Sequence, residues 1–167
     1  MKSLIVILFI FISATCIKAQ DYHNALRISY GDYWGFHYKR MFSQEKGMMA
    51  NLQINNKGAQ LTGLRVIHTP AFPATSSKWF FGYGYGAHLA YRTEIQSGNV
   101  FRPFAPPIVY KGHYFSPGFD GYLSLEYRFL KYPFTLSADY IPGFEFFGPG
   151  FFRMNMNNLS ISAAFTF

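Results

Sequence analysis

Hydrophobic and polar side chains alternate with a period of two along most of the chain, and the stretch from Lys78 to Arg92 shows this most clearly. A period of two is typical of a β-strand whose two faces meet different surroundings. At about 3.3 Å per residue, a strand of this length crosses a bilayer with tilt. One face carries Trp79, Phe81, Tyr83, Tyr85, Ala87, Leu89 and Tyr91. The other face carries Phe80, Gly82, Gly84, Gly86, His88, Ala90 and Arg92.

Three later segments repeat the alternation. The short connection 130–133 predicts that the first two form a hairpin. Their apolar faces are Phe119, Leu123, Leu125, Tyr127 and Phe129, then Phe134, Leu136, Ala138 and Tyr140, and finally Leu159, Ile161, Ala163, Phe165 and Phe167.

The first half of the chain is less regular but supplies four more strands, at about 26–30, 34–39, 48–54 and 59–69. The turn 55–58 (Asn-Asn-Lys-Gly) favours a hairpin. We expect a β-bulge near Gly63 and Leu64, where the alternation breaks. Eight strands in one chain predict an all-β fold, an eight-stranded antiparallel up-and-down transmembrane β-barrel.

Connection lengths predict the topology, because periplasmic turns of such barrels are short and extracellular loops are long. With both chain ends periplasmic, the connections 31–33, 55–58, 93–118 and 141–152 face outward. The connections 43–47, 70–77 and 130–133 then face the periplasm.

The N-terminus has the form of a cleaved signal peptide. Lys2 precedes an apolar core from Leu4 to Ile12, and Ala19 suits the last position before cleavage. We therefore expect a signal peptide over 1–19 and a barrel over 20–167. A membrane anchor, or a lipoprotein attached through Cys16, is the alternative. Cys16 is the single cysteine, so the mature chain contains no disulfide.

Composition fits alternating strands better than membrane helices. Aromatic residues make up 21% of the chain, yet no apolar run after the N-terminus approaches the roughly 20 residues that a membrane helix needs. Fifteen Lys and Arg against eight Asp and Glu give a net charge of +7. For an exported protein this charge predicts contact with anionic membrane lipid and lipopolysaccharide, and no nucleic acid partner.

Several of these segments resemble the small outer-membrane β-barrel proteins common in Bacteroidetes-type bacteria, with a barrel size similar to OmpX and the OmpA membrane domain. The matching stretches are 26–28, 35–39, 61–64, 81–88, 121–129 and 137–142. The final strand, which ends in Phe167, resembles the signal that barrel-assembly machinery binds. The resemblance implies localisation in the bacterial outer membrane and no agreed biochemical activity. We expect a monomer.

The polar face predicts the content of the lumen. An eight-stranded barrel is only wide enough for its own side chains, so ions inside it must be paired. We expect an ion-pair plug, with a proton or ion path as the alternative. Arg92 should pair with Asp120, and Asp139 should reach Glu126 or Arg128. The expected inward set is Arg27, Lys39, Arg65, Arg92, Asp120, Glu126, Arg128 and Asp139.

Gly82, Gly84 and Gly86 are expected to make room inside the barrel for Tyr122. Outward aromatic residues at strand ends are expected to form an interfacial girdle. They are Trp34, Trp79, Tyr91, Tyr127 and Tyr140.

No residue pattern predicts a catalytic, cofactor-binding or metal site. None of His23, His37, His68, His88 and His113 has metal-ligand spacing with another ligand residue.

Three functions remain open. The first is a non-enzymatic structural or surface-interaction barrel, with the aromatic and proline-rich connection 93–118 as a surface for an extracellular partner. The second is a lipid A-modifying membrane enzyme, which needs a His, Ser and acid cluster; His113 and Ser116 fall in the predicted loop. The third is a soluble, lipocalin-like periplasmic barrel that turns its apolar face inward to bind an apolar ligand.

Overall fold

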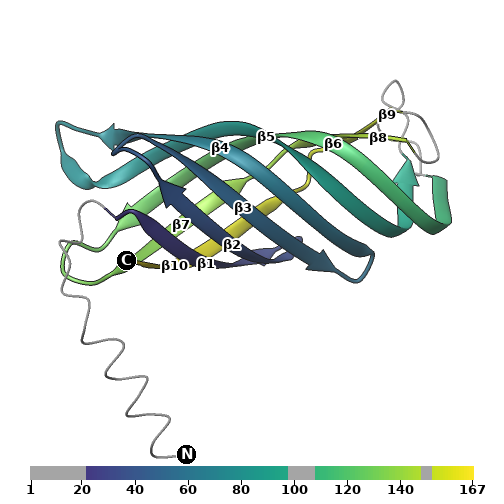
Figure 1. Cartoon of the computed structure of the whole chain (residues 1–167), viewed down its shortest axis with the longest axis horizontal. Helices are drawn as coiled ribbons and strands as arrows, with labels where there is room; N and C mark the ends of the chain where they lie inside the picture. The colour runs from purple at the N-terminus through teal and green to yellow at the C-terminus, as the bar shows by residue number, and fades with distance from the viewer. Residues whose placement is uncertain (1–21, 98–107, 148–151) are drawn as a thin grey trace, which may run out of the picture.

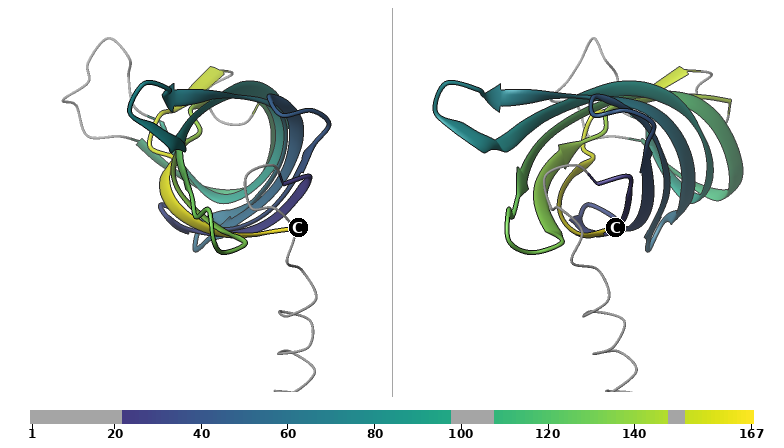
Figure 2. Two further views of the ribbon diagram at one scale, coloured as in Figure 1. Left: turned by 90° about the vertical axis from the view of Figure 1, so that its left-hand side faces the viewer. Right: turned by 60° about the vertical axis from the view of Figure 1, so that its left-hand side comes forward.

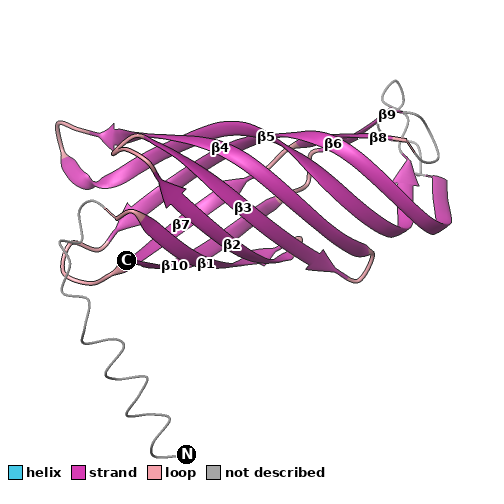
Figure 3. Cartoon of the chain, viewed as in Figure 1, coloured by secondary structure: helices cyan, strands magenta, loops and turns pink. Residues whose placement is uncertain are grey.

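The computed structural model describes residues 22–97, 108–147 and 152–167, and every regular element in these ranges is a β-strand (Figure 3). No helix in the described part of the chain is long and apolar enough to cross a membrane. The first five strands are β1 (Asn24–Gly31), β2 (Trp34–Met41), β3 (Lys46–Asn55), β4 (Gly58–Phe72) and β5 (Ser76–Ser97). The remaining strands are β6 (Ile108–Arg128), β7 (Phe134–Tyr140), β8 (Gly143–Phe146), β9 (Phe152–Asn155) and β10 (Leu159–Thr166).

The strands close into one antiparallel barrel, which is seen end-on in Figure 2. Each of β1 to β6 pairs with the strand that follows it. β7 then pairs with β10, and β10 pairs with β1, which closes the barrel. β8 follows β7 and also pairs with β6, while β9 pairs with β8 and leads into β10. Counting β7 with β8 and β9 with β10, the barrel has eight antiparallel strands, as the sequence predicts.

Both ends of the barrel chain lie together (Figure 1). The backbones of Asn24 and Phe167 exchange two hydrogen bonds of 2.9 Å. We call this the terminal end of the barrel; it also carries the turns β2–β3, β4–β5 and β6–β7. The other end, which we call the distal end, carries the turns β1–β2 and β3–β4 and the long β5–β6 hairpin (Figure 1).

The two faces of the barrel wall are the reverse of those of a water-soluble protein. Along β1, Leu26 and Ile28 point outward and are 55% and 53% exposed, whereas Arg27 and Ser29 point inward and are 2% and 1% exposed. The same alternation continues around the barrel, with mainly apolar side chains outside and mainly polar or charged side chains buried inside. The predicted assignment of apolar residues to one face is confirmed.

The prediction of a long connection at 93–118 is wrong, because β5 and β6 continue through most of this segment. They pair as far as Ser97 and Ile108, with one register shift between Arg92 and Glu94. Phe101, Phe104 and the nearby prolines lie outside the described residues. The predicted connection 141–152 likewise contains β8 and the first residue of β9.

The predicted bulge at Gly63 and Leu64 is also wrong. β4 pairs without interruption past this point, and its register shifts only between Pro70 and Phe72. Arg65 consequently points outward and is exposed. The alternation breaks here because β4 turns two apolar residues, Leu64 and Val66, into the lumen, where they join a buried cluster with Tyr122 and Met49.

The inward glycines of β5 have two different roles. A Cβ on Gly82 would lie 3.4 Å from the Tyr122 ring, so this glycine makes room for the tyrosine as predicted. A Cβ on Gly84 or Gly86 would instead collide with the backbone oxygen of Arg65 or Gly63 in β4. These two glycines allow close approach of the neighbouring strand.

Candidate functional site

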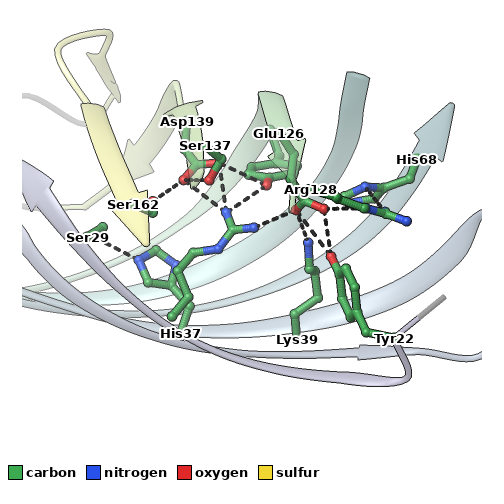
Figure 4. A network of polar contacts seen from close by, with 12 residues as sticks. Tyr22, Ser29, His37, Lys39, His68, Glu126, Arg128, Ser137, Asp139 and Ser162 are labelled. Atoms are coloured by element: carbon green, nitrogen blue, oxygen red, sulfur yellow. Dashed lines mark hydrogen bonds and ion pairs between the residues drawn. The ribbon is translucent and has the colours of Figure 1, made fainter. Parts of the chain in front are cut away.

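A polar network in the lumen is built around the carboxylate of Glu126 on β6 (Figure 4). This carboxylate accepts from Lys39 Nζ at 2.6 Å, from Arg128 Nε at 2.8 Å and from Arg27 Nη2 at 2.9 Å. Glu126, Lys39 and Arg27 side chains are fully buried. Charged groups in such surroundings are tolerated only when paired and hydrogen-bonded. Glu126 therefore neutralises cations from three separate strands.

Asp139 on β7 forms a second centre, and Arg27 joins the two. Arg27 Nη1 lies 2.9 Å from the Asp139 carboxylate while its Nη2 holds Glu126. The Asp139 carboxylate also accepts from Tyr122 Oη at 3.1 Å and from the hydroxyl of Ser162 on β10. Asp139 was expected to lie within reach of Glu126 or Arg128; the structure instead gives it Arg27 as its ion-pair partner, and Arg27 links it to Glu126.

Tyr22, just before β1, was not predicted as part of this network. Its hydroxyl donates to Glu126 at 2.9 Å, and its ring lies against the cations of Arg128 and Lys39, at 4.8 and 5.0 Å from the ring centroid. Burial and the Glu126 carboxylate raise the pKa of Tyr22 well above its ordinary value, so the hydroxyl keeps its proton and donates. Tyr22 therefore adds a buried hydroxyl and a ring to this network.

Two buried histidines complete this part of the lumen. His37 Nε2 lies 2.7 Å from Ser29 Oγ, and Arg128 Nη2 lies 3.3 Å from His68 Nδ1. In the described ranges, no three His, Cys, Asp or Glu side chains gather as metal ligands would.

The distal half of the lumen holds separate pairs, and the predicted pairing of Arg92 with Asp120 is wrong. Arg92 Nη2 donates to Glu145 on β8 at 2.7 Å, while Asp120 Oδ2 lies 2.7 Å from His88 Nδ1. Arg153 on β9 also contacts Glu145. Pairing of β8 with β6 explains the difference, because it holds Glu145, which the sequence placed in the connection 141–152, on the barrel wall opposite Gly118. Alternation of Phe144, Glu145 and Phe146 was the signal available for this inward carboxylate.

A polar cup of about 410 Å³ opens at the distal end above Arg92 and Glu145. Its wall includes the exposed ion pair of Lys57 and Glu94, whose atoms are 3.0 Å apart.

The side chains of the two residues considered for a lipid-modifying enzyme point to opposite faces of the barrel wall. His113 points outward on β6, where its ring stacks on Tyr91, while Ser116 points inward and is fully buried. The His88–Asp120 pair is inside the barrel. The structure therefore does not bring His113 and Ser116 together at the outer face.

The arrangement as a whole is a plug of mutually bonded side chains. Oppositely charged groups from four strands (β1, β2, β6 and β7) hold one another across the lumen at the terminal half, and the hydroxyl of Ser162 on β10 joins them. A lumen lined in this way does not offer the apolar interior that the lipocalin-like alternative requires. No family model, curated protein or solved structure matches the chain.

Proposed function

We propose that this chain is an outer-membrane β-barrel of a Gram-negative bacterium, exported with a cleaved signal peptide over 1–19, with a structural or surface-interaction role and no catalysis. One observation carries the proposal: large apolar side chains cover the outside of the closed barrel, and ion pairs fill its inside. Exposed apolar patches on soluble monomers rarely exceed a few hundred Å². Contact between apolar surface and water costs free energy, about 25 cal/mol for each Å². A hydrocarbon environment around the barrel removes this cost.

The closed strand pairing supports the same proposal. In hydrocarbon every backbone amide and carbonyl needs a partner, and a closed barrel provides one without leaving an edge. The family resemblance and the expected signal peptide agree with export to the outer membrane. The side-chain plug argues against an open pore. The structural or surface-interaction role is therefore assigned to the outer wall or to the distal rim.

The distal rim is the part of the barrel suited to contact other molecules. The β5–β6 hairpin extends beyond the neighbouring strands (Figure 1) and exposes Ile108, Val109 and Phe115. Residues 108–117 of β6 pair only with β5 in the described part of the chain, since β8 joins β6 at Gly118.

Gel mobility of the outer-membrane fraction tests the proposal. A closed barrel resists detergent at room temperature and migrates differently after boiling. We expect the protein in this fraction, with a mobility shift on boiling. Recovery in the soluble periplasmic fraction without a shift would overturn the proposal.

A further inference from the structure

The outer face of the barrel carries an apolar groove of about 660 Å³ that runs from β7 over β10, β1, β2 and β3 to β4. Its walls are formed by exposed, bulky side chains such as Leu26, Ile28 and Phe36. Two small outward residues, Ala163 on β10 and Ala50 on β3, interrupt the bulky rows and leave the space open. The lining is almost entirely apolar, so the groove fits a hydrocarbon chain.

Three basic side chains lie on the same outer face, near the terminal end of the barrel. Strand register places Arg40 of β2 and Arg65 of β4 opposite Met48 of β3, one on each side. Lys46 precedes Met48 by two residues and therefore points to the same side. With strands about 4.8 Å apart, the two arginine Cα atoms are separated by about 10 Å. Arg40, Lys46 and Arg65, which we call the basic cluster, are all exposed.

Neither arginine is neutralised by a neighbour in the described structure. Neither arginine has an ion pair there, and the Arg40 guanidinium lies over the Phe42 ring, 5.9 Å from its centroid. Glu45, in the adjoining β2–β3 turn, is the acidic residue nearest in sequence. The cluster therefore keeps an excess of positive charge on an otherwise apolar face.

The groove and the basic cluster meet at Gly63. This outward glycine of β4 is opposite Ala50 in the register and two residues before Arg65. A Cβ placed on Gly63 would find no atom within 4 Å. Open space thus continues from the groove at Ala50 toward the arginines.

We propose that this face binds one anionic glycerophospholipid, with its phosphate group on the basic cluster and an acyl chain in the groove. The inference rests on the proposed function, because it needs the outer face to lie in a bilayer. Arginine guanidinium groups pair with phosphate oxygens through two parallel hydrogen bonds. A charge on the lipid face of a barrel is costly at the bilayer midplane and inexpensive near the interface. A lipid phosphate near the interface can pair with the arginines of the basic cluster, and the apolar groove then holds the acyl chain of the same lipid.

The experiment compares variants of the mature barrel refolded into phosphatidylcholine vesicles with and without phosphatidylglycerol. Native mass spectrometry after extraction counts the phosphatidylglycerol retained by each barrel. We expect one retained lipid for the unchanged protein, and retention about tenfold weaker in Arg65→Gln, which loses charge-assisted hydrogen bonds. Lys111→Gln removes the same charge from the exposed distal hairpin and is the matched control, with unchanged retention expected.

Gly63→Leu tests the groove separately from the charge. The added side chain enters open space, so the barrel is expected to fold while retention of the lipid falls. Equal retention in Arg65→Gln, Gly63→Leu and the unchanged protein would overturn the proposal. A cross-linked dimer seated on the groove would overturn it as well. Failure of every variant to insert into vesicles, seen as no mobility shift on boiling, would instead refute the membrane barrel itself.

Discussion

Glu126→Gln is the substitution to which the barrel should be most sensitive. Its carboxylate holds three cations at 2.6, 2.8 and 2.9 Å and is fully buried. After the substitution Arg27 keeps Asp139, but Lys39 loses its one ion pair in the described structure. Removing one partner from a buried ion pair costs about 3–5 kcal/mol, since the other charge stays buried without compensation. We expect a loss of this size in the free energy of unfolding.

Denaturant unfolding of the barrel refolded into vesicles, followed by gel mobility with and without boiling, measures this loss. Glu94→Gln is the matched control, because Glu94 pairs with Lys57 on the rim, where the two side chains are 29% and 45% exposed. Exposed pairs contribute about 0–1 kcal/mol. Lys39→Met added to Glu126→Gln should restore part of the stability by removing an uncompensated charge. Equal unfolding free energies for Glu126→Gln and Glu94→Gln would refute the ion-pair plug.

Three further substitutions test the wall, the packing and the last strand. Leu52→Arg places a charge on the outer face of β3 and should lower the free energy of unfolding in vesicles by up to about 2–4 kcal/mol. An unchanged free energy of unfolding in denaturant titrations would indicate that this face meets water. Gly82→Leu should cost about 1–3 kcal/mol by overpacking against Tyr122 and Ser124, and a calorimetric midpoint equal to that of the unchanged protein would contradict this. Phe167→Ser should reduce the amount of barrel in the outer membrane while purified protein refolds normally, which immunoblots of membrane fractions check; unchanged levels would refute recognition through Phe167.

The wall of the barrel could be predicted because one physical rule governs it. Wherever a strand separates two environments, a period of two appears, and β1, β2, β3, β7 and β10 lie where the alternation placed them. The rule failed where a strand breaks it locally. β4 turns Leu64 and Val66 inward, so apolar residues occupy both faces and the register was misread.

The extent of β6 was missed for a different reason. Gly112, Pro117 and Gly118 are typical of loops, yet β6 passes through all three. Proline is compatible with a strand whose second edge has no partner, and β8 joins β6 only from Gly118 onward. Strand pairing, which is a property of the closed barrel, decided this segment.

The candidate site was predictable as a set of residues and not as a set of pairs. Seven of the eight expected inward residues are buried in the lumen, and Arg65 is the exception. Which cation meets which carboxylate depends on the stagger between strands, and this brought Glu145 to Arg92 and His88 to Asp120. Tyr22 lies before the first strand, where no periodicity indicates an inward position.

The most direct test of the account is the accessibility of single cysteines placed along β3, since the expected mature chain has no cysteine of its own. Leu52 and Ile54 point outward, and Asn51 and Gln53 point inward and are fully buried. With the barrel in vesicles, spin labels at 52 and 54 should be relaxed by oxygen, which dissolves in lipid, and not by a water-soluble nickel complex. Strong relaxation of the same two labels by the nickel complex would show that the apolar face meets water and would contradict a membrane-spanning barrel.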